Sequence, residues 1–342
     1  MSPQKILAAL IERRDLTRQE MLSVMRAIMQ GEVAAPLIAA IITALRMKGE
    51  TITEIAAAAT VMRELSAKVT TVQDTAHLVD TCGTGGDSAH TFNISTTAAF
   101  VAAAAGARVA KHGGRAVSSQ SGSADVLELL GVNINLTPEQ VGACIDEVGL
   151  GFMFAPNHHS AMKHAAPVRR ELGVRTIFNL LGPLTNPAGA PNQVMGVYHP
   201  DLVEVQARVL RELGSRHALI VHGMEGLDEI SIAGETLVGE LKEGEVTQYR
   251  VSPEDFGLAP HALDEIKVAD AAQSRDMVLA VLEGRHAAGC GIVALNAGAS
   301  IYAAGLAPTL LTGVTRAREV IATGAARDKL QQLVAYTQGV VA

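Results

Sequence analysis

The sequence lacks tryptophan, and only 3% of its 342 residues are aromatic. Aromatic platforms on which single-stranded nucleic acid could stack are therefore excluded. Basic residues are also in deficit, since 28 Lys and Arg face 35 Asp and Glu and give a net charge of −7. This balance argues against a general polyanion binder and leaves room for a local basic pocket. With 48% hydrophobic residues, the chain can still bury a large core of Ala, Gly, Val, Ile and Leu.

Cysteine is scarce as well. Cys82, Cys144 and Cys290 are odd in number, lie far apart and show no Cys-x-x-Cys spacing. This pattern argues against a disulfide framework and a structural zinc site, and it favours a reducing cytoplasm. The histidines show no His-x-x-x-His or His-Glu-x-x-His spacing, which also makes zinc improbable.

Long hydrophobic runs are missing too. The longest, residues 98–107, has ten residues, whereas a membrane-spanning helix needs about 20. Residues 6–10 are too few for the apolar region of a signal peptide. We therefore expect a cytoplasmic protein that contacts no membrane. The length predicts two domains, or one large domain carrying a smaller one.

The first seventy residues have helical patterns. Thr17 with Glu20 and Thr51 with Glu54 each form the spacing of a capping box, in which side chains satisfy free backbone N–H groups at a helix start. Gly31 and Gly49 are expected to end the first two of these helices. The sequence therefore predicts an all-helical N-terminal segment.

After residue 75, short apolar runs alternate with helical segments. Strands are expected near 77–81, 107–110, 150–155, 193–198 and 217–222, with a helix over 202–213 between the last two. Such alternation predicts an α/β fold with a mainly parallel sheet, whose functional groups gather at the carboxyl ends of the strands. Residues 235–251 alternate like an antiparallel hairpin at the edge of that sheet.

Three polar loops are candidates for binding phosphate. The first, Asp80–Asp87, carries Gly83, Gly85 and Gly86 between a strand and a helix, where backbone N–H groups can approach an anion. It is neither a P-loop nor a dinucleotide fingerprint, because no Gly-Lys-Ser/Thr follows and Ser88 replaces the third glycine. The second runs over 91–97 and supplies hydroxyls and an amide. The third, residues 111–123, combines two cations with paired glycines and serines.

Six motifs across residues 83–187 stand in the order and spacing of anthranilate phosphoribosyltransferases. They are Gly-Thr-Gly-Gly-Asp at 83–87, Asn-Ile-Ser-Thr at 93–96, Lys-His-Gly at 111–113, Ser-Gly-Ser-Ala-Asp at 121–125, Pro-Val-Arg-Arg-Glu-Leu at 167–172 and Phe-Asn-Leu-Leu-Gly-Pro-Leu-Thr-Asn-Pro at 178–187. The chain resembles this family from end to end, including its helical N-terminus and its length.

The resemblance implies a small all-helical domain, residues 1–72 with a contribution from about 165–190, joined to a larger α/β domain, residues 73–342. It implies a homodimer formed through the helical domain. The expected reaction transfers phosphoribosyl from phosphoribosyl pyrophosphate (PRPP) to the amine of anthranilate, in tryptophan synthesis, with two Mg²⁺ per monomer. Positioning and leaving-group stabilisation are expected to supply the rate, so no catalytic acid or base is assigned.

The resemblance also implies roles for individual residues. Ser95, Asp228 and Glu229 would hold magnesium, which suits hard oxygen ligands. Gly83, Gly114 and Arg169 would contact anthranilate, with the Arg169 guanidinium facing its carboxylate. His112 and His159 match positions near the aromatic substrate. The expected PRPP site consists of Gly83, Gly86, Asp87, Thr91, Asn93, Ile94, Ser95, Thr96, Lys111, His112, Gly113, Gly114, Arg115, Ala116, Val117, Ser118, Ser119 and Ser123.

One residue departs from the family pattern. The family usually reads Lys-His-Gly-Asn-Arg, and this chain has Gly114 in place of the Asn. The acceptor subsite therefore lacks one polar side chain. We expect this change to affect which acceptor binds and how tightly, and to affect PRPP binding less. Two alternatives remain at this point: a pyrimidine nucleoside phosphorylase, and a non-catalytic relative that binds nucleic acid or phosphorylated ligands. The Ser-Gly-Ser-Ala-Asp loop, the Asp228–Glu229 pair and the net charge argue against them.

Overall fold

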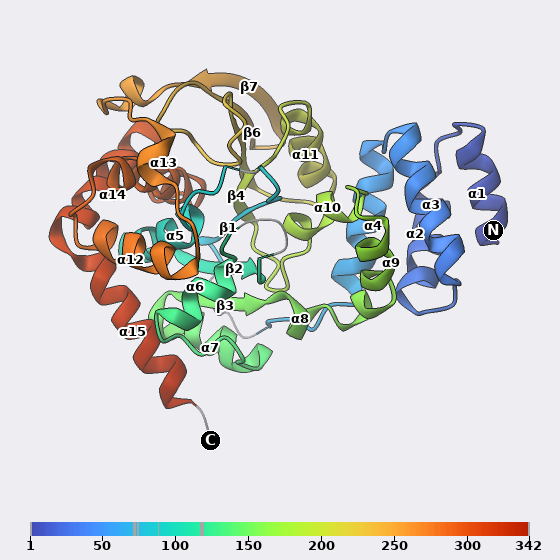
Figure 1. The fold of residues 1–342 in the computed structure, drawn as a ribbon, viewed down its shortest axis with the longest axis horizontal. Helices are drawn as coiled ribbons and strands as arrows, with labels where there is room; N and C mark the ends of the chain where they lie inside the picture. Colours follow the sequence, from blue (N-terminus) through green and yellow to red (C-terminus); the bar gives the residue numbers. More distant parts are fainter. Residues whose placement is uncertain (1, 71–72, 74, 88, 117–119, 341–342) are drawn as a thin grey trace.

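The computed structural model describes residues 2–340 except 71–72, 74, 88 and 117–119. Its N-terminal part is all-helical, as predicted, and the described residues form four helices there (Figure 1). These are α1 (Pro3–Ile11), α2 (Arg18–Met29), α3 (Ala35–Lys48) and α4 (Ile52–Glu64). Both predicted capping boxes are formed, at Thr17 and Glu20 and at Thr51 and Glu54. Helix α3 ends at Gly49, whose φ of +88° favours glycine.

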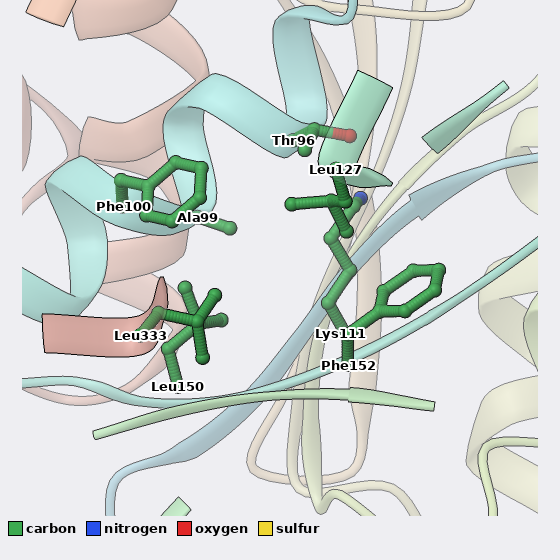
Figure 2. A pocket seen from close by; sticks show the side chains of 8 residues that line it. All are labelled: Thr96, Ala99, Phe100, Lys111, Leu127, Leu150, Phe152 and Leu333. Carbon is green, nitrogen blue, oxygen red and sulfur yellow. The ribbon is translucent and has the colours of Figure 1, made fainter. Parts of the chain in front are cut away.

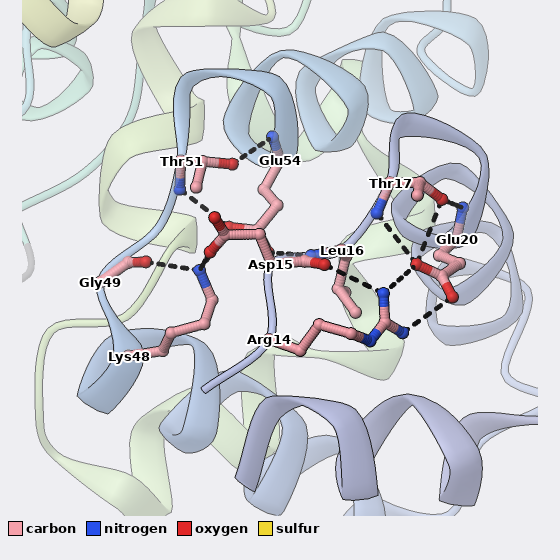
Figure 3. Close-up of polar contacts among 9 residues, drawn as sticks. All are labelled: Arg14, Asp15, Leu16, Thr17, Glu20, Lys48, Gly49, Thr51 and Glu54. Atoms are coloured by element: carbon pink, nitrogen blue, oxygen red, sulfur yellow. Dashed lines mark hydrogen bonds and ion pairs between the residues drawn. The ribbon is translucent and has the colours of Figure 1, made fainter. Parts of the chain in front are cut away.

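A buried ion pair ties these helices together. Glu54 is fully buried, and one of its carboxylate oxygens lies 2.9 Å from Lys48 Nζ (Figure 3). The same carboxylate accepts hydrogen bonds from the backbone N–H groups of Thr51 and Leu16, both at 2.8 Å. Because Leu16 precedes α2 and Lys48 ends α3, Glu54 joins three helices through groups that all favour its charge.

The central sheet contains seven strands in the order β3-β2-β1-β4-β5-β6-β7. Strands β1 to β5 pair in parallel, and β6 and β7 form the predicted antiparallel hairpin at one edge. Their bounds are β1 Leu78–Gly83, β2 Arg108–Gly113, β3 Leu150–Phe154, β4 Asn192–Gly196, β5 His217–Gly223, β6 Thr236–Lys242 and β7 Glu245–Val251. The predicted fold class, a helical part joined to a larger α/β part with a mainly parallel sheet, is confirmed.

Helices connect and cover these strands (Figure 1). The α-helices are α5 Ile94–Ala104, α6 Ser123–Leu129, α7 Pro138–Val148, α8 Ala155–His158, α9 Ala166–Leu172, α10 Phe178–Leu181, α11 Asp201–Glu212, α12 Ala271–Leu282, α13 Ala287–Ala303, α14 Leu310–Thr323 and α15 Ala325–Gly339. Short 3₁₀ helices span Ser160–His164, Gly182–Leu184, Pro253–Phe256 and Leu263–Ile266. No single helix in the described ranges is long and apolar enough to cross a bilayer, and α12 and α13 reach that length only as a pair bent by 79°.

Each face of the sheet packs into a different hydrophobic cluster. On β5, Leu219 and Val221 pack with α5 and α13, whereas Ala218 and Ile220 pack into the cluster that contains the N-terminal helices. Alternation along the strand sends successive side chains to opposite faces. Helices α9 and α10 contribute Val168, Phe178 and Leu181 to the second cluster. The N-terminal helices therefore share a core with one face of the sheet, through α9, α10 and α11.

Candidate active site

The carboxyl end of β1 carries the glycine loop. Gly85 and Gly86 have φ values of +66° and +77°, a left-handed backbone that side chains rarely adopt. The Gly85 N–H donates to Asp228 Oδ2 at 2.8 Å. A Cβ added to Gly83 would lie 2.5 Å from that same oxygen, so only glycine fits there without moving Asp228. The loop and the acidic residue after β5 thus lie in direct contact.

Asp228 and Glu229 form a half-buried acidic pair that faces two of the predicted loops. Glu229 Oε1 accepts from the Ser95 N–H at 3.1 Å, and Asp87 Oδ2 accepts from the Asp228 N–H at 3.5 Å. Burial raises the pKa of Asp228 well above its usual range, and repulsion from Asp87 and Glu229 adds to this. Burial likewise raises the pKa of Glu229 to about 7. Burial and the neighbouring carboxylates therefore disfavour the charged forms of Asp228 and Glu229, and a bound cation would favour them.

Lys111 is buried beside this cluster. Its ammonium donates to the Thr81 carbonyl at 2.6 Å and to Ser95 Oγ at 3.2 Å, and burial lowers its pKa. Its aliphatic stem lines a cavity of about 10 Å³ together with Thr96 and apolar side chains (Figure 2). Thr96 Oγ1 is buried and has no hydrogen-bond partner among the described residues. This cavity is too small for a substrate. The Lys111 ammonium reaches the acidic pair's surroundings through its hydrogen bond to Ser95 Oγ.

Asn93 connects two predicted loops to α12. Its Oδ1 accepts from Ser121 Oγ at 2.8 Å and from Ser274 Oγ at 2.7 Å, while its Nδ2 donates to the Ser121 carbonyl at 3.2 Å. Ile94 follows as a buried first residue of α5, and Thr91 bridges to Lys267. Ser274 was not predicted, because it lies 181 residues from Asn93 and belongs to no motif.

The third loop packs tightly against the start of α6. Ser123 Oγ donates to the Gly114 carbonyl at 3.3 Å, and a Cβ on Gly113 would lie 2.2 Å from that hydroxyl oxygen. The Ala116 N–H donates to Asp125 Oδ2 at 2.9 Å. Gly114 has nothing within 4 Å of an added Cβ, so the space of the missing Asn is open. Val117, Ser118 and Ser119 lie outside the described residues.

Arg115, which was predicted to contact PRPP, forms ion pairs within the protein. Its guanidinium pairs with Asp125 at 3.0 Å and Glu128 at 2.6 Å, so both partners are carboxylates of α6. A phosphate contact would require the side chain to leave them, and this role stays a prediction.

The residues expected at the acceptor side form a second group. The His112 and His159 rings lie 5.0 Å apart, and burial lowers their pKa values to about 3 and about 4, which keeps both imidazoles neutral. The Nε2 atoms of both are buried without a partner among the described residues. Arg169 Cζ lies 5.4 Å from the centre of the Phe178 ring, and in the described part of the chain this guanidinium has no acidic partner. Among the described residues, Arg169 makes no hydrogen bond or ion pair with residues 83–87.

Arg175 is a second site residue that sequence reasoning missed. It follows α9, three residues after the last recognised motif position there, and its guanidinium donates to the Gly86 carbonyl and stacks on Tyr198. Nothing in its local sequence marks it. A recess of about 300 Å³ lies elsewhere, between α13, α14 and the Leu258–His261 loop, and shares no lining residue with this site.

The acidic pair fits a magnesium ion. Within the described residues, no three His, Cys, Asp or Glu side chains converge as a complete metal site. Asp228 and Glu229 nevertheless offer hard oxygen donors, and a bound cation would offset the burial that raises their pKa values. Mg²⁺ commonly takes only one or two protein carboxylates and completes its coordination with substrate phosphates and water.

Comparison with known proteins identifies the family. Residues 4–66 match the helical bundle domain of the glycosyl transferase family, and residues 75–327 match its α/β domain. Anthranilate phosphoribosyltransferase from Thiobacillus denitrificans is 64% identical over 98% of both chains, and that from Chromobacterium violaceum is 62% identical over 99% of this chain and 98% of its own.

Solved structures agree. The crystal structure of anthranilate phosphoribosyltransferase from Thermus thermophilus is 45% identical with a TM-score of 0.92, covering 97% of this chain and 99% of that one. The Saccharomyces cerevisiae enzyme in complex with PRPP and Mg is 25% identical with a TM-score of 0.89, covering 99% and 98%. Together, the acidic pair, the loops that meet at one sheet edge and the similarity over the full length show that the chain belongs to the anthranilate phosphoribosyltransferase family.

Proposed function

We propose that this protein transfers the phosphoribosyl group of PRPP to the amine of anthranilate, releasing pyrophosphate, as a step of tryptophan biosynthesis. The observation that carries the proposal is the acidic pair. Asp228 accepts from the Gly85 N–H and Glu229 from the Ser95 N–H, so the pair reaches two of the three predicted PRPP loops at once. A relative of this fold holds PRPP and Mg together, which supports the same ligands here.

PRPP is held chiefly by backbone groups and hydroxyls. The glycine loop offers N–H groups, and Ser95 is the second residue of α5, in the first turn, where a helix N-terminus favours anions. Lys111 supplies positive charge through Ser95 rather than through an exposed ammonium. The third loop contributes Gly113, Gly114 and Ser123 beside the ribose and phosphates.

Two magnesium ions per monomer complete the site. Ser95 would hold one with the pyrophosphate, and Asp228 and Glu229 would hold the other. When bound, magnesium neutralises the charge that develops on departing pyrophosphate. The fit rests on oxygen donors, burial and the raised pKa values of both carboxyls.

The reaction is a displacement at the anomeric carbon. The carbon–oxygen bond to pyrophosphate breaks, the bond to the anthranilate nitrogen forms, and the surplus proton of the amine leaves to solvent. An aromatic amine is already neutral, so orientation supplies most of the rate. The Arg169 guanidinium would face the anthranilate carboxylate as a planar fork. His112 and His159, both neutral, would line the aromatic ring.

Three further properties belong to this proposal. The helical part, residues 1–72 with about 165–190, and the α/β part, residues 73–342, act as two domains. Two copies associate through the helical part, and the protein works in the cytoplasm without nucleic acid or membrane partners.

One assay tests the function. The protein is incubated with anthranilate, PRPP and Mg²⁺, and anthranilate fluorescence is followed. Consumption that requires both PRPP and Mg²⁺ is expected. Absence of consumption together with phosphate-dependent cleavage of a pyrimidine nucleoside would identify a phosphorylase instead, and absence of both reactions would identify a binding protein.

A further inference from the structure

Arg175 contacts the glycine loop from outside the predicted motifs. It lies between α9 and α10, and its guanidinium donates to the carbonyl oxygen of Gly86. It has no acidic partner in the part of the chain that the structure describes, so this carbonyl is its hydrogen-bonding contact there. A Cβ added to Gly86 would lie 3.3 Å from Arg175 Nη2, which shows how closely the loop approaches the guanidinium.

The bond to Gly86 fixes the plane of one peptide. In a trans peptide the C=O and the following N–H point in opposite directions, so a carbonyl held toward Arg175 turns the Asp87 N–H away from it. The N–H groups of Thr84 and Gly85 are used internally, by Gly196 and Asp228. The N–H groups of Gly86 and Asp87 have no acceptor among the described residues. These two successive donors are what the loop can offer to an anion.

Without Arg175 this peptide would be poorly fixed. Glycine at position 86 allows the peptide to rotate, and rotation would turn a carbonyl dipole toward the anion and the N–H away. We propose that Arg175 is a positioning residue for PRPP: it holds the Gly86 carbonyl outward, so that the Asp87 N–H of the same peptide faces a phosphate beside the Gly86 N–H. The inference rests on the proposed function and names a residue beyond it.

The Tyr198 ring supports the Arg175 guanidinium by stacking against it. Arg175 Cζ lies 3.9 Å from the centre of the Tyr198 ring, a close cation–π contact. The Tyr198 N–H donates to Thr84 Oγ1 at 3.1 Å, so the stacking residue is tied to the same glycine loop. Burial raises the pKa of the Tyr198 hydroxyl, and the Arg175 charge opposes this rise.

The experiment measures Mg²⁺·PRPP binding by calorimetry without anthranilate, and KM for each substrate separately. For Arg175→Ala, we expect the Kd and KM for PRPP to rise roughly tenfold or more, because a charged hydrogen bond is lost. The KM for anthranilate and the melting temperature should stay near wild type. Arg175→Lys should restore only part of the affinity, since an ammonium cannot donate to the carbonyl and stack as a planar group. Val174→Ala, an exposed neighbour on the same segment, is the matched control.

A second pair of variants tests the stacking of Arg175 on Tyr198. Tyr198→Phe keeps the ring and should bind PRPP as wild type does, whereas Tyr198→Leu should resemble Arg175→Ala. The double variant Arg175→Ala/Tyr198→Leu should lose no more affinity than Arg175→Ala alone, because both act through one contact.

Unchanged PRPP affinity in Arg175→Ala, or an equal loss for both substrates, would overturn the proposal. Lower melting temperatures with normal PRPP affinity would make Arg175 merely structural. If the wild-type protein binds Mg²⁺·PRPP and consumes no anthranilate, the proposed function fails while the positioning role is still measured by calorimetry. Failure of the wild type to bind PRPP would overturn both.

Discussion

Asp228 accepts a hydrogen bond from the Gly85 N–H at 2.8 Å, across 143 residues of sequence. This contact joins the loop after β5 to the loop after β1, and Glu229 extends it to α5 through the Ser95 N–H. A single acidic pair therefore sets the relative position of two loops as well as offering oxygens to a metal. Removing either side chain is expected to affect metal use and loop position together, whereas removing only its charge should affect metal use alone.

Asp228→Asn keeps the size of the side chain and removes its charge. The amide oxygen can still accept from Gly85, so the loop should keep its place, whereas the attraction for Mg²⁺ falls. We expect turnover to drop roughly tenfold to a hundredfold and to need more magnesium for half its maximum. Activity measured over a magnesium titration checks this. Unchanged magnesium dependence would remove Asp228 from the metal site.

A substitution of Gly196 tests how closely the carboxyl end of β4 approaches the Asp228 backbone. A Cβ at this position would lie 1.5 Å from the Asp228 carbonyl oxygen, so Gly196→Ala must displace the acidic loop. We expect a loss of about 3 kcal/mol or more in the free energy of unfolding, measured by denaturant titration. Gly234→Ala is the control, because nothing lies within 4 Å of its added Cβ. Equal stability of the two variants would contradict the packing.

Gly114→Asn restores the residue that the family usually carries. The site has open space for the side chain, since no atom lies within 4 Å of an added Cβ. One new hydrogen bond to the acceptor should lower the KM for anthranilate by up to roughly tenfold, while that for PRPP stays nearly constant. Steady-state kinetics with each substrate varied checks the split. Equal shifts in both constants would contradict the acceptor-subsite assignment.

Local patterns predicted the fold and part of the site. The capping boxes at Thr17 and Thr51 need only residues three apart, and the meeting of the loops follows from parallel strands ending at one sheet edge. Ser274 and Arg175 were not predictable in this way. Each reaches the site through packing between distant segments, Ser274 from α12 and Arg175 from the segment before α10, and neither stands in a pattern that marks a ligand.

Glu54 offers a stability test away from the site. Its buried carboxylate pairs with Lys48 and accepts two backbone N–H groups (Figure 3). Glu54→Gln leaves the mostly buried Lys48 ammonium with the exposed Asp15 carboxylate and the Gly49 carbonyl, so we expect about 3 kcal/mol lower stability. Glu64→Gln breaks the exposed pair with Arg26 and should cost less than about 1 kcal/mol. Chemical denaturation of both variants separates these values, and similar losses would contradict a buried pair.

The capping box of α2 gives a prediction for pH. The hydrogen bond from Arg14, then that from the Thr17 N–H, lowers the pKa of Glu20 from 4.5 to about 2. A carboxyl with a lowered folded-state pKa contributes stability above its unfolded pKa and loses that contribution as pH falls through the folded value. Glu20 should therefore stabilise the protein fully above about pH 5 and progressively less toward pH 2. Glu20→Gln should be less stable at neutral pH and should lose less stability on acidification between pH 5 and 2. Denaturant titrations of both proteins across that range measure the difference, and parallel pH profiles would show that the Glu20 contacts do not favour its charged form.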